Sequence, residues 1–537
     1  MKRLKNPYLI GIFVAGAAFL IRIYRLQSMH NYIDDLSARQ AIIVLDMING
    51  IWHFPFSPYL FEFDEPGLAF LTLPFVYLFG KSWSVFQYFS VVSGVLATFA
   101  LFLLTARLVS TYAGTAAALV YGLLPCMLFW NRFYFMSGID WLTIIWLGVL
   151  LLLFKKNGIS SISAALAGFL VGLGMYLTSL IHLITPAAAY LILFKSNSDD
   201  NHRWKKRIAN LFIFSSCIII TSSLILIDLI RQPNYLLWRK THFISWNTGF
   251  FNTILVWLKN ITEIIYEMFL HTKNFINIPP GKTLIVWPLA LLFLWGIISS
   301  FKYRRFRSPG LSSLIVVITW LLLIATLKSE PFRGIYFSLP IPFLAILSGI
   351  GLHSLLNILF KKTQRLWWIS TLILCTVWSG FCLWSFLYGP FKHPGREDVL
   401  TRLQLDLKKL PDIPCLVSTK ISDVRYYHFP FWFVMRSYMS SVTVFTWNET
   451  GFYISEDVPK TKFAFESAPD QKTAFIVTRN ELEALRTMML PYKSIGIKKL
   501  AHSHLFLMTY PVTPTEPARL NWRTSAVPQF LPSSDTP

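Results

Sequence analysis

The sequence predicts an α-helical polytopic membrane protein of about eleven transmembrane helices, with a small α/β domain outside the membrane near its C-terminus. Three observations predict this fold class. Of the 537 residues, 54% are hydrophobic and only 14% are charged, which is typical of membrane-spanning chains. Apolar runs long enough to cross a bilayer recur along residues 1–390. This high hydropathy is lost from residue 391 onwards.

Each predicted span is an apolar run close to the roughly 20 residues that cross a hydrocarbon core as a helix. The spans lie near residues 8–25, 84–105, 111–130, 138–154, 160–178, 180–195, 208–229, 283–301, 310–328, 335–359 and 367–388. The shorter run at 66–82 is flanked by Gly and Pro, and we interpret it as a re-entrant or interfacial piece of an external loop, 26–83. A second external loop, 231–282, has the aromatic and amphipathic character that favours the headgroup layer.

The net charge of +22 comes mainly from short connectors between the spans. The basic clusters are Lys155-Lys156, Arg203 with Lys205-Lys206-Arg207, Lys302 with Arg304, Arg305 and Arg307, and Lys361-Lys362 with Arg365. Lys2, Arg3 and Lys5 favour a cytoplasmic N-terminus, and alternating the spans from there places every cluster inside. The charge therefore predicts a multi-pass protein of the plasma (inner) membrane whose C-terminal domain is extracytoplasmic. The bilayer explains the charge, and no nucleic-acid partner is predicted.

Three domains follow from this pattern. They are a transmembrane domain, 1–390, an extracytoplasmic α/β domain, 391–512, and a tail, 513–537, that is rich in Pro, Ser and Thr and predicted to be disordered. In the α/β domain, strand-like and helix-like runs alternate. The strand-like runs are Val442–Thr446, Ala474–Val477 and His504–Thr509, and the helix-like run is Glu481–Met489.

The acidic residues of the first external loop are the main candidates for chemistry. Asp34 and Asp35 follow the first span, and Asp64 and Glu65 precede Pro66. Carboxylates at an external membrane surface suit proton transfer or metal binding on a substrate delivered by lipid. Each pair also has a simpler reading, because Asp34 precedes a helical pattern and Glu65 precedes a proline. Either residue could cap a helix.

Several motifs in fixed order accompany these acids. They are Leu20-Ile21-Arg22-Ile23-Tyr24-Arg25-Leu26, Asp34-Asp35, Gly50-Ile51-Trp52, Asp64-Glu65-Pro66-Gly67, Leu78-Phe79-Gly80, Asn131-Arg132 with Asp140, and Arg333-Gly334-Ile335-Tyr336 with Pro340 and Pro342. Over about residues 8–390 this order resembles the GT-C glycosyltransferases, in particular the family 39 protein O-mannosyltransferases and the related lipid A aminoarabinose transferase. Two departures, Glu65 in place of a lysine and Gln87 in place of an arginine, remove positive charge near the expected donor phosphate.

The resemblance implies an inverting glycosyltransferase that moves a sugar from a polyprenyl-phosphate donor to an acceptor hydroxyl on the extracytoplasmic face. The acceptor would be a lipid, a glycan or a protein. The candidate site residues are Asp34 and Asp35 for catalysis, with Asp34 as the base; Arg132, Arg333 and Tyr336 for the donor phosphate; and Asp64, Glu65 and Asp140 for substrate or metal. A divalent metal ion is a candidate cofactor, held by Asp64 or Glu65 with His53 or His242.

Other interpretations stay open. A membrane transporter could use Asp34 and Asp140 to bind a cation or relay protons. Transporters, however, usually carry such acids near the midplane and show inverted repeats, and neither is visible here. A catalytically silent GT-C relative acting in envelope assembly is a third class. Arg132 could also snorkel to the headgroups, and Arg333 could pair with Glu330.

Two sequons for N-glycosylation, Asn260-Ile261-Thr262 and Asn448-Glu449-Thr450, are predicted to face outside. The resemblance implies a bacterial host, in which we expect these sequons to carry no meaning.

Overall fold

The computed structural model of the chain describes the helical part almost continuously and the C-terminal part by its strands. The described residues are 7–24, 26, 35–48, 67–154, 159–194, 202–231, 250–269, 287–326, 335–359, 373, 377, 380, 381 and 384, followed by the strands given below. The chain divides into two compact units. One comprises residues 1–26, 61–68 and 87–393, and the other comprises 27–60, 69–86 and 394–537.

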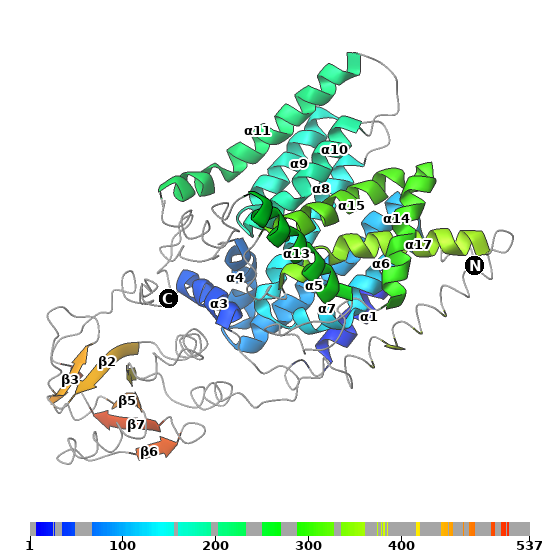
Figure 1. The fold of residues 1–537 in the computed structure, drawn as a ribbon. Helices are drawn as coiled ribbons and strands as arrows, with labels where there is room; N and C mark the ends of the chain where they lie inside the picture. Colours follow the sequence, from blue (N-terminus) through cyan, green and yellow to red (C-terminus); the bar gives the residue numbers. More distant parts are fainter. Residues whose placement is uncertain are drawn as a thin grey trace. The chain divides into compact units, whose positions relative to one another are not determined.

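Helices make up almost all of the described N-terminal part (Figure 1). Their bounds are α1 Pro7–Ile23, α3 Asp35–Ile48, α4 Gly67–Phe79, α5 Trp83–Leu108, α6 Thr111–Leu123, α7 Pro125–Trp130, η2 Tyr134–Met136, α8 Ser137–Leu153, α9 Ser161–Gly174, η3 Ser179–Ile184, α10 Thr185–Phe194, α11 His202–Arg231, α13 Phe250–Phe269, α14 Trp287–Lys302, α15 Arg304–Ala325, α16 Ile335–Ser338 and α17 Ile341–Leu359. Among the described residues, α5, α11, α15 and α17 are long and apolar enough to cross a bilayer, and further apolar helices are shorter. The predicted class, a helical membrane protein, is confirmed.

Prolines divide two of the predicted spans. The run 111–130 forms α6 and α7, which meet at Pro125, and the run 335–359 forms α16 and α17, which are separated by Leu339 and Pro340. A proline has no N–H to continue a preceding helix, but it fits the first turn of a new one. The run 66–82, predicted to be re-entrant or interfacial, contains the helix α4. Most of the run 367–388 lies outside the described residues.

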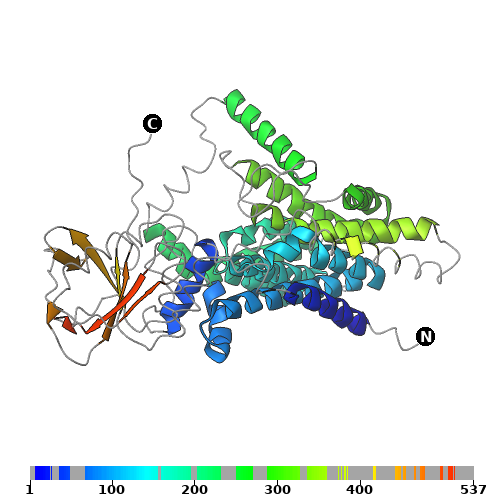
Figure 2. The ribbon, with the colours of Figure 1, turned by 90° about the horizontal axis from the view of Figure 1, so that it is seen from below.

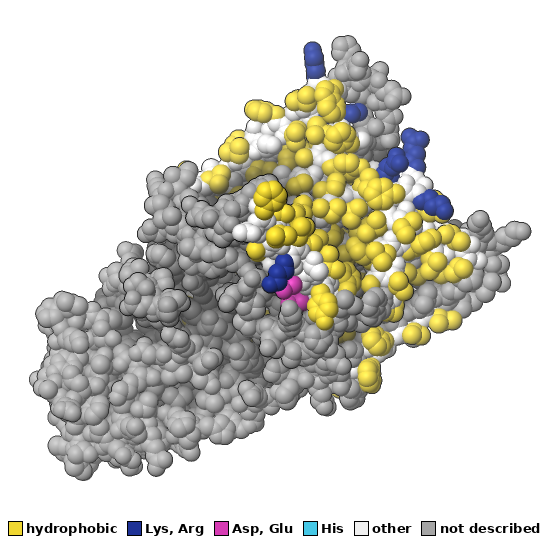
Figure 3. Space-filling view, viewed as in Figure 1, with side chains coloured by type: hydrophobic (Ala, Val, Ile, Leu, Met, Phe, Trp, Pro, Cys, Tyr) yellow, Lys and Arg dark blue, Asp and Glu magenta, His cyan; other side chains and the backbone are white. Residues whose placement is uncertain are grey.

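The core of the helical bundle is built around α17. Its residues from Ile341 to Ser354 are buried on every side, as expected of a helix surrounded by other helices. It packs against α6, α14 and α15, while α9 packs against α8 and α11 (Figure 1). Figure 3 shows that hydrophobic side chains cover most of the described surface on the face over α15 and α17. Such a surface is suited to lipid rather than to water.

The helix ends predicted to be cytoplasmic lie together in the bundle. At the C-terminal end of α10, Arg207 donates to the Leu193 carbonyl over 3.0 Å, and Arg307 interacts electrostatically with Tyr190. At the far end of α17, His353 is hydrogen-bonded to Ser110 over 3.1 Å. The basic starts of α11 and α15 therefore both lie close to the C-terminal end of α10.

The C-terminal part forms a six-stranded mixed sheet, whose strands lie side by side in Figure 2. The strands are β1 Cys415–Ser418, β2 Val442–Asn448, β3 Gly451–Ile454, β4 Phe465–Glu466, β5 Lys472–Val477, β6 Gly496–Lys499, β7 Phe506–Pro511 and β8 Thr513–Pro514. Their order in the sheet is β3-β2-β1-β5-β7-β6, with β1 parallel to both β2 and β5 and the other pairs antiparallel. The strands β4 and β8 pair separately.

The three strand-like runs of the sequence overlap β2, β5 and β7, whereas the helix-like run 481–489 lies outside the described residues. The strand β8 begins at Thr513, the first residue of the predicted tail, and pairs with β4, while residues 515–537 lie outside the described residues. Backbone pairing with an upstream strand fixes this segment despite its Pro and Thr content.

Candidate functional site

The predicted catalytic pair lies at the start of α3. Asp34 is outside the described residues, and α3 begins at the next residue, Asp35, whose side chain is not described either. The helix runs to Ile48, so the helical pattern predicted after Asp34 is confirmed. A carboxylate at the residue before a helix can accept from the first free N–H groups, which would fix its direction. The assignment of Asp34 as base stays a prediction.

A buried polar cluster lies within the helical bundle and centres on Asp140. This residue is in the first turn of α8 and is completely buried. Its Oδ1 accepts a hydrogen bond from the Tyr121 hydroxyl of α6, and its Oδ2 accepts one from Asn131 Nδ2, both over 2.6 Å. The carboxylate, a candidate for substrate or metal binding, thus has a donor from within the bundle on each oxygen.

The positive member of this cluster is Arg22, in the last turn of α1. It is also completely buried, and its Nη1 donates to Thr98 Oγ1 of α5 over 3.2 Å. Thr98 in turn donates to the Gly94 carbonyl over 2.7 Å. Arg22 and Asp140 attract each other electrostatically. The cluster therefore brings together α1, α5, α6 and α8, and it joins opposite charges inside a hydrophobic bundle.

The short segment after α7, residues 131–136, is held at several points. The Phe133 carbonyl accepts from Ser90 of α5 over 2.9 Å, and the Tyr134 ring lies edge-on to Phe89. The Tyr134 carbonyl accepts from Ser137. Each contact ties the segment to α5 or α8, so it is built as a fixed part of the bundle.

Arg132 belongs to this segment and was predicted to bind the donor phosphate. Its side chain is 1% exposed, and its Nη2 donates to the Tyr24 carbonyl, at the end of α1, over 2.8 Å. Burial lowers the pKa of its guanidinium to about 10, so the group remains cationic at neutral pH. The positive charge is present, but it is directed at the backbone of α1.

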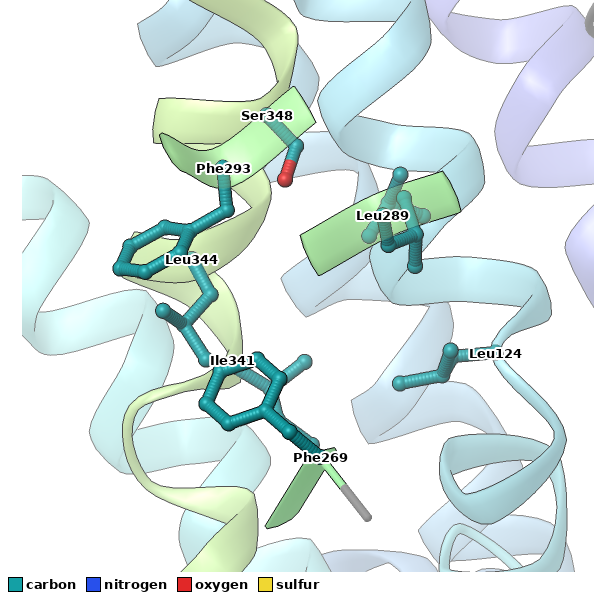
Figure 4. A pocket seen from close by; sticks show the side chains of 8 residues that line it. Leu124, Phe269, Leu289, Phe293, Ile341, Leu344 and Ser348 are labelled. Atoms are coloured by element: carbon teal, nitrogen blue, oxygen red, sulfur yellow. The ribbon is translucent and has the colours of Figure 1, made fainter. Parts of the chain in front are cut away.

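An apolar crevice lies between α6, α13, α14 and α17 (Figure 4). It is lined by Val120, Leu124, Phe269, Leu289, Phe293, Ile341, Leu344 and Ser348. Among these residues, Ser348 alone has a polar side chain. Leu124, Leu289 and Ile341 lie near helix ends that are predicted to be extracytoplasmic. The crevice has a volume of about 10 Å³, room for roughly one water molecule, and its apolar lining is that of closely packed helices.

The remaining predicted site residues are not brought together by the described structure. Asp64, Glu65, His53, His242 and Arg333 lie outside the described residues. Tyr336 is in α16, but its side chain is not described. In the part of the chain that the structure describes, no group of three or more His, Cys, Asp and Glu is placed to hold a metal ion.

Three members of the cluster were not predicted as site residues, namely Arg22, Thr98 and Tyr121. Arg22 was seen only as part of a motif. A signal was available, because an arginine inside an apolar span is costly unless a partner compensates it. That signal points to a partner without saying which residue it is.

Neither the protein-family models nor the curated protein sequences give a match to the chain. Among solved structures, it is similar to ArnT from Cupriavidus metallidurans bound to undecaprenyl phosphate, with 12% identity and a TM-score of 0.55 over 93% of this chain and 97% of that one. The chain has a GT-C fold. The apo state of the same ArnT gives a TM-score of 0.54 with the same identity and coverage.

A weaker likeness is found to the archaeal oligosaccharyltransferase AglB from Archaeoglobus fulgidus in complex with an inhibitory peptide and a dolichol-phosphate. It has 14% identity and a TM-score of 0.49, over 80% of this chain and 64% of that one. Another structure of the Archaeoglobus enzyme, a complex with Zn and sulfate, has a TM-score of 0.46 at 13% identity, over 80% of this chain and 62% of that one. The likeness to ArnT confirms the predicted resemblance to GT-C enzymes for the fold.

Proposed function

We propose that this chain is an inverting glycosyltransferase that uses a polyprenyl-phosphate sugar on the extracytoplasmic face of the plasma membrane. The observation that carries the proposal is the GT-C fold shared with ArnT over 93% of the chain, together with the undecaprenyl phosphate bound to that relative.

The reaction is a single displacement at the anomeric carbon. The acceptor oxygen forms a bond to this carbon, and the bond from the carbon to the phosphate oxygen breaks. Polyprenyl phosphate leaves with the electron pair, and the configuration of the sugar is inverted. The acceptor proton passes to a carboxylate, for which we propose Asp34, with Asp35 supporting its charge. The acceptor would be a lipid, a glycan or a protein with a free hydroxyl.

The leaving phosphate needs a cation or strong hydrogen-bond donors as its charge develops. We propose Arg333 and Tyr336 for this task rather than the buried Arg132, whose Nη2 is used by the Tyr24 carbonyl. Arg333 and Tyr336 precede α17 in the sequence, at the end of this helix that is predicted to be extracytoplasmic. Asp64 and Glu65, with His53 or His242, remain the proposed ligands if a divalent metal ion takes part.

The experiment that tests the proposal is Asp34→Asn in the purified full-length protein. Asparagine caps a helix about as well as aspartate but does not accept the proton, so we expect turnover to fall by about 10²–10⁴-fold. Sugar transfer would be measured with a panel of polyprenyl-phosphate sugars, and binding with undecaprenyl phosphate, which should remain unchanged.

Asp35→Asn is the matched control, and its loss of turnover should be smaller. Normal turnover by Asp34→Asn would show that Asp34 is not the base, and a loss of stability in Asp34→Ala would then show that it caps α3. Ion flux in proteoliposomes, without release of polyprenyl phosphate, would favour the transporter interpretation instead.

A further inference from the structure

The Arg22–Asp140 cluster contains two opposite charges that are buried in the helical bundle. Both side chains are completely buried, and a buried charge is strongly unfavourable unless an opposite charge compensates it. Within the described residues no hydrogen bond joins the two, and Arg22 Nε and Nη2 have no hydrogen-bond partner. The carboxylate instead accepts from the neutral donors of Tyr121 and Asn131. The two charges therefore attract each other through the core without a direct hydrogen bond. The burial of each charge is compensated by the other.

Two glycines of the neighbouring helices leave the space that polar side chains of the cluster occupy. A Cβ added to Gly94 of α5 would come within 2.8 Å of both Asn131 Cγ and Nδ2. A Cβ added to Gly122 of α6 would come within 3.0 Å of Thr98 Cγ2. The neighbouring helices thus carry glycine at the points where the polar side chains enter, and a side chain at Gly94 would displace the amide that donates to Asp140.

We propose that Asp140 is the counter-ion of Arg22 and a positioning residue, and that it does not bind substrate or metal. Through Asn131 it holds the segment 131–136, and the next residue, Arg132, holds the Tyr24 carbonyl. Arg22 secures the same turn of α1 against Thr98. The cluster thereby fixes the exit of α1 from two sides.

A fixed exit of α1 positions Asp34, which follows Tyr24 by ten residues in the sequence. This consequence for catalysis rests on the proposed function, in which Asp34 is the base. The pairing of Arg22 with Asp140 does not depend on that assumption. Stability measurements test the pairing, and binding and transfer measurements test the positioning role.

A double-mutant cycle tests the pairing. The variants are Arg22→Met, Asp140→Asn and the two combined, in the full-length protein, with thermal unfolding and the yield of folded protein as readouts. Each single change leaves one buried charge without its counter-charge, whereas the combined change removes both. We expect the double variant to unfold at a higher temperature, or to give more folded protein, than either single variant. Additive losses, with the double variant the least stable, would overturn the pairing.

Two further variants complete the stability test. Lys259→Met removes an exposed charge of α13 and should leave the unfolding temperature unchanged. Gly94→Ala keeps every polar group and displaces the Asn131 amide, so hydrogen exchange in segment 131–136 should accelerate more than in α9 and α11. Uniform acceleration across the bundle, or none, would show that Asn131 does not hold the segment.

Binding of undecaprenyl phosphate separates a positioning residue from a ligand. The double variant should bind this lipid as the wild type does and should lose sugar transfer through kcat rather than KM. If Asp140 instead contacts the lipid directly or through a metal, binding should fall by about tenfold or more in both Asp140→Asn and the double variant. Arg333→Ala tests the proposed phosphate site separately. If this variant binds undecaprenyl phosphate unchanged, the proposed phosphate site is contradicted, but the double-mutant cycle of Arg22 and Asp140 can still be interpreted.

Discussion

At the residue scale, Asn260 both begins an N-glycosylation sequon and donates a hydrogen bond to the C-terminal end of α15. The sequon was predicted to face the extracytoplasmic side, and the Asn260 side chain is 1% exposed. Its Nδ2 donates to the Ala325 carbonyl of α15 over 2.9 Å, and Trp257 Nε1 lies 3.4 Å from the Leu322 carbonyl. The last carbonyl groups of a helix have no partner within it, and in a membrane they find no water. The two side chains of α13 therefore cap α15.

We expect Asn260→Ala to destabilise the protein by about 1–3 kcal/mol, because the buried Ala325 carbonyl loses its donor. The matched control is Thr262→Ala, which also removes the sequon but changes an exposed hydroxyl, so its effect should stay within about 0.5 kcal/mol. Thermal unfolding of both variants is the measurement. Equal losses would show that the capping amide has no special role.

At the scale of elements, the contact between α9 and α11 depends on a G-x-x-x-G pattern. The ideal Cβ of Gly168 would lie 2.3 Å from the Phe214 carbonyl oxygen, and that of Gly172 would lie 2.9 Å from the Ile218 carbonyl oxygen. Small residues of this kind allow helix backbones to approach closely in membranes, where helices gain little from hydrophobic burial. Since the obstacle is backbone rather than a flexible side chain, it cannot move aside without shifting α11.

Gly168→Ala should therefore destabilise the protein by about 1–3 kcal/mol, the usual cost of overpacking. Gly16→Ala is the control, because nothing lies within 4 Å of its added Cβ in α1 and alanine is the better helix former. Unfolding in the same detergent would compare the two. A stable Gly168→Ala variant would mean that α11 can withdraw from α9 at little cost.

Element positions were the part of the fold that the sequence predicted best. Long apolar runs predict helices because the backbone must satisfy its own hydrogen bonds in lipid. The helix α13 was missed as an element, since its polar residues Asn260 and Glu267 are buried while Phe251 and Leu255 are exposed. Apolar Ile264 and Met268 are buried beside these two polar residues, so the inward face is mixed in polarity and could not be assigned from the sequence.

At the scale of the whole molecule, the orientation in the membrane is the central prediction. A reporter that is active only outside the cytoplasm should be active when fused after residue 395 and inactive when fused near Lys205. The basis is that the basic starts of α11 and α15 lie together at the C-terminal end of α10. There Arg207 donates to the Leu193 carbonyl and Arg307 interacts with Tyr190. Fusion-reporter activity in intact cells is the measurement. Activity near Lys205 would reverse the orientation and place Asp34 in the cytoplasm.

The candidate site was predicted less completely than the fold. Motif order identified Asp140 and Arg132 as notable, but it assigned them to substrate and phosphate. Tyr24 is 108 residues from Arg132, and although Tyr121 and Asn131 are only 19 and 9 residues from Asp140, helix packing brings them to its carboxylate. Hydropathy does not encode this packing. Hydropathy depends on each residue and its neighbours, whereas compensation of a buried charge depends on the assembled bundle.

The distance in sequence between Arg22 and Asp140 also constrains how the protein is made. Asp140 is synthesised about 120 residues after Arg22, which at about 5–20 residues per second takes roughly 6–24 s. During this interval α1 carries a cation whose counter-charge does not yet exist. Arg22 is in the last turn of α1, so its long side chain can reach the aqueous interface while the chain grows. We therefore expect the arginine to leave water for the core only after α8 has entered the membrane, so that α1 docks after α8 has been made and not as soon as it is inserted.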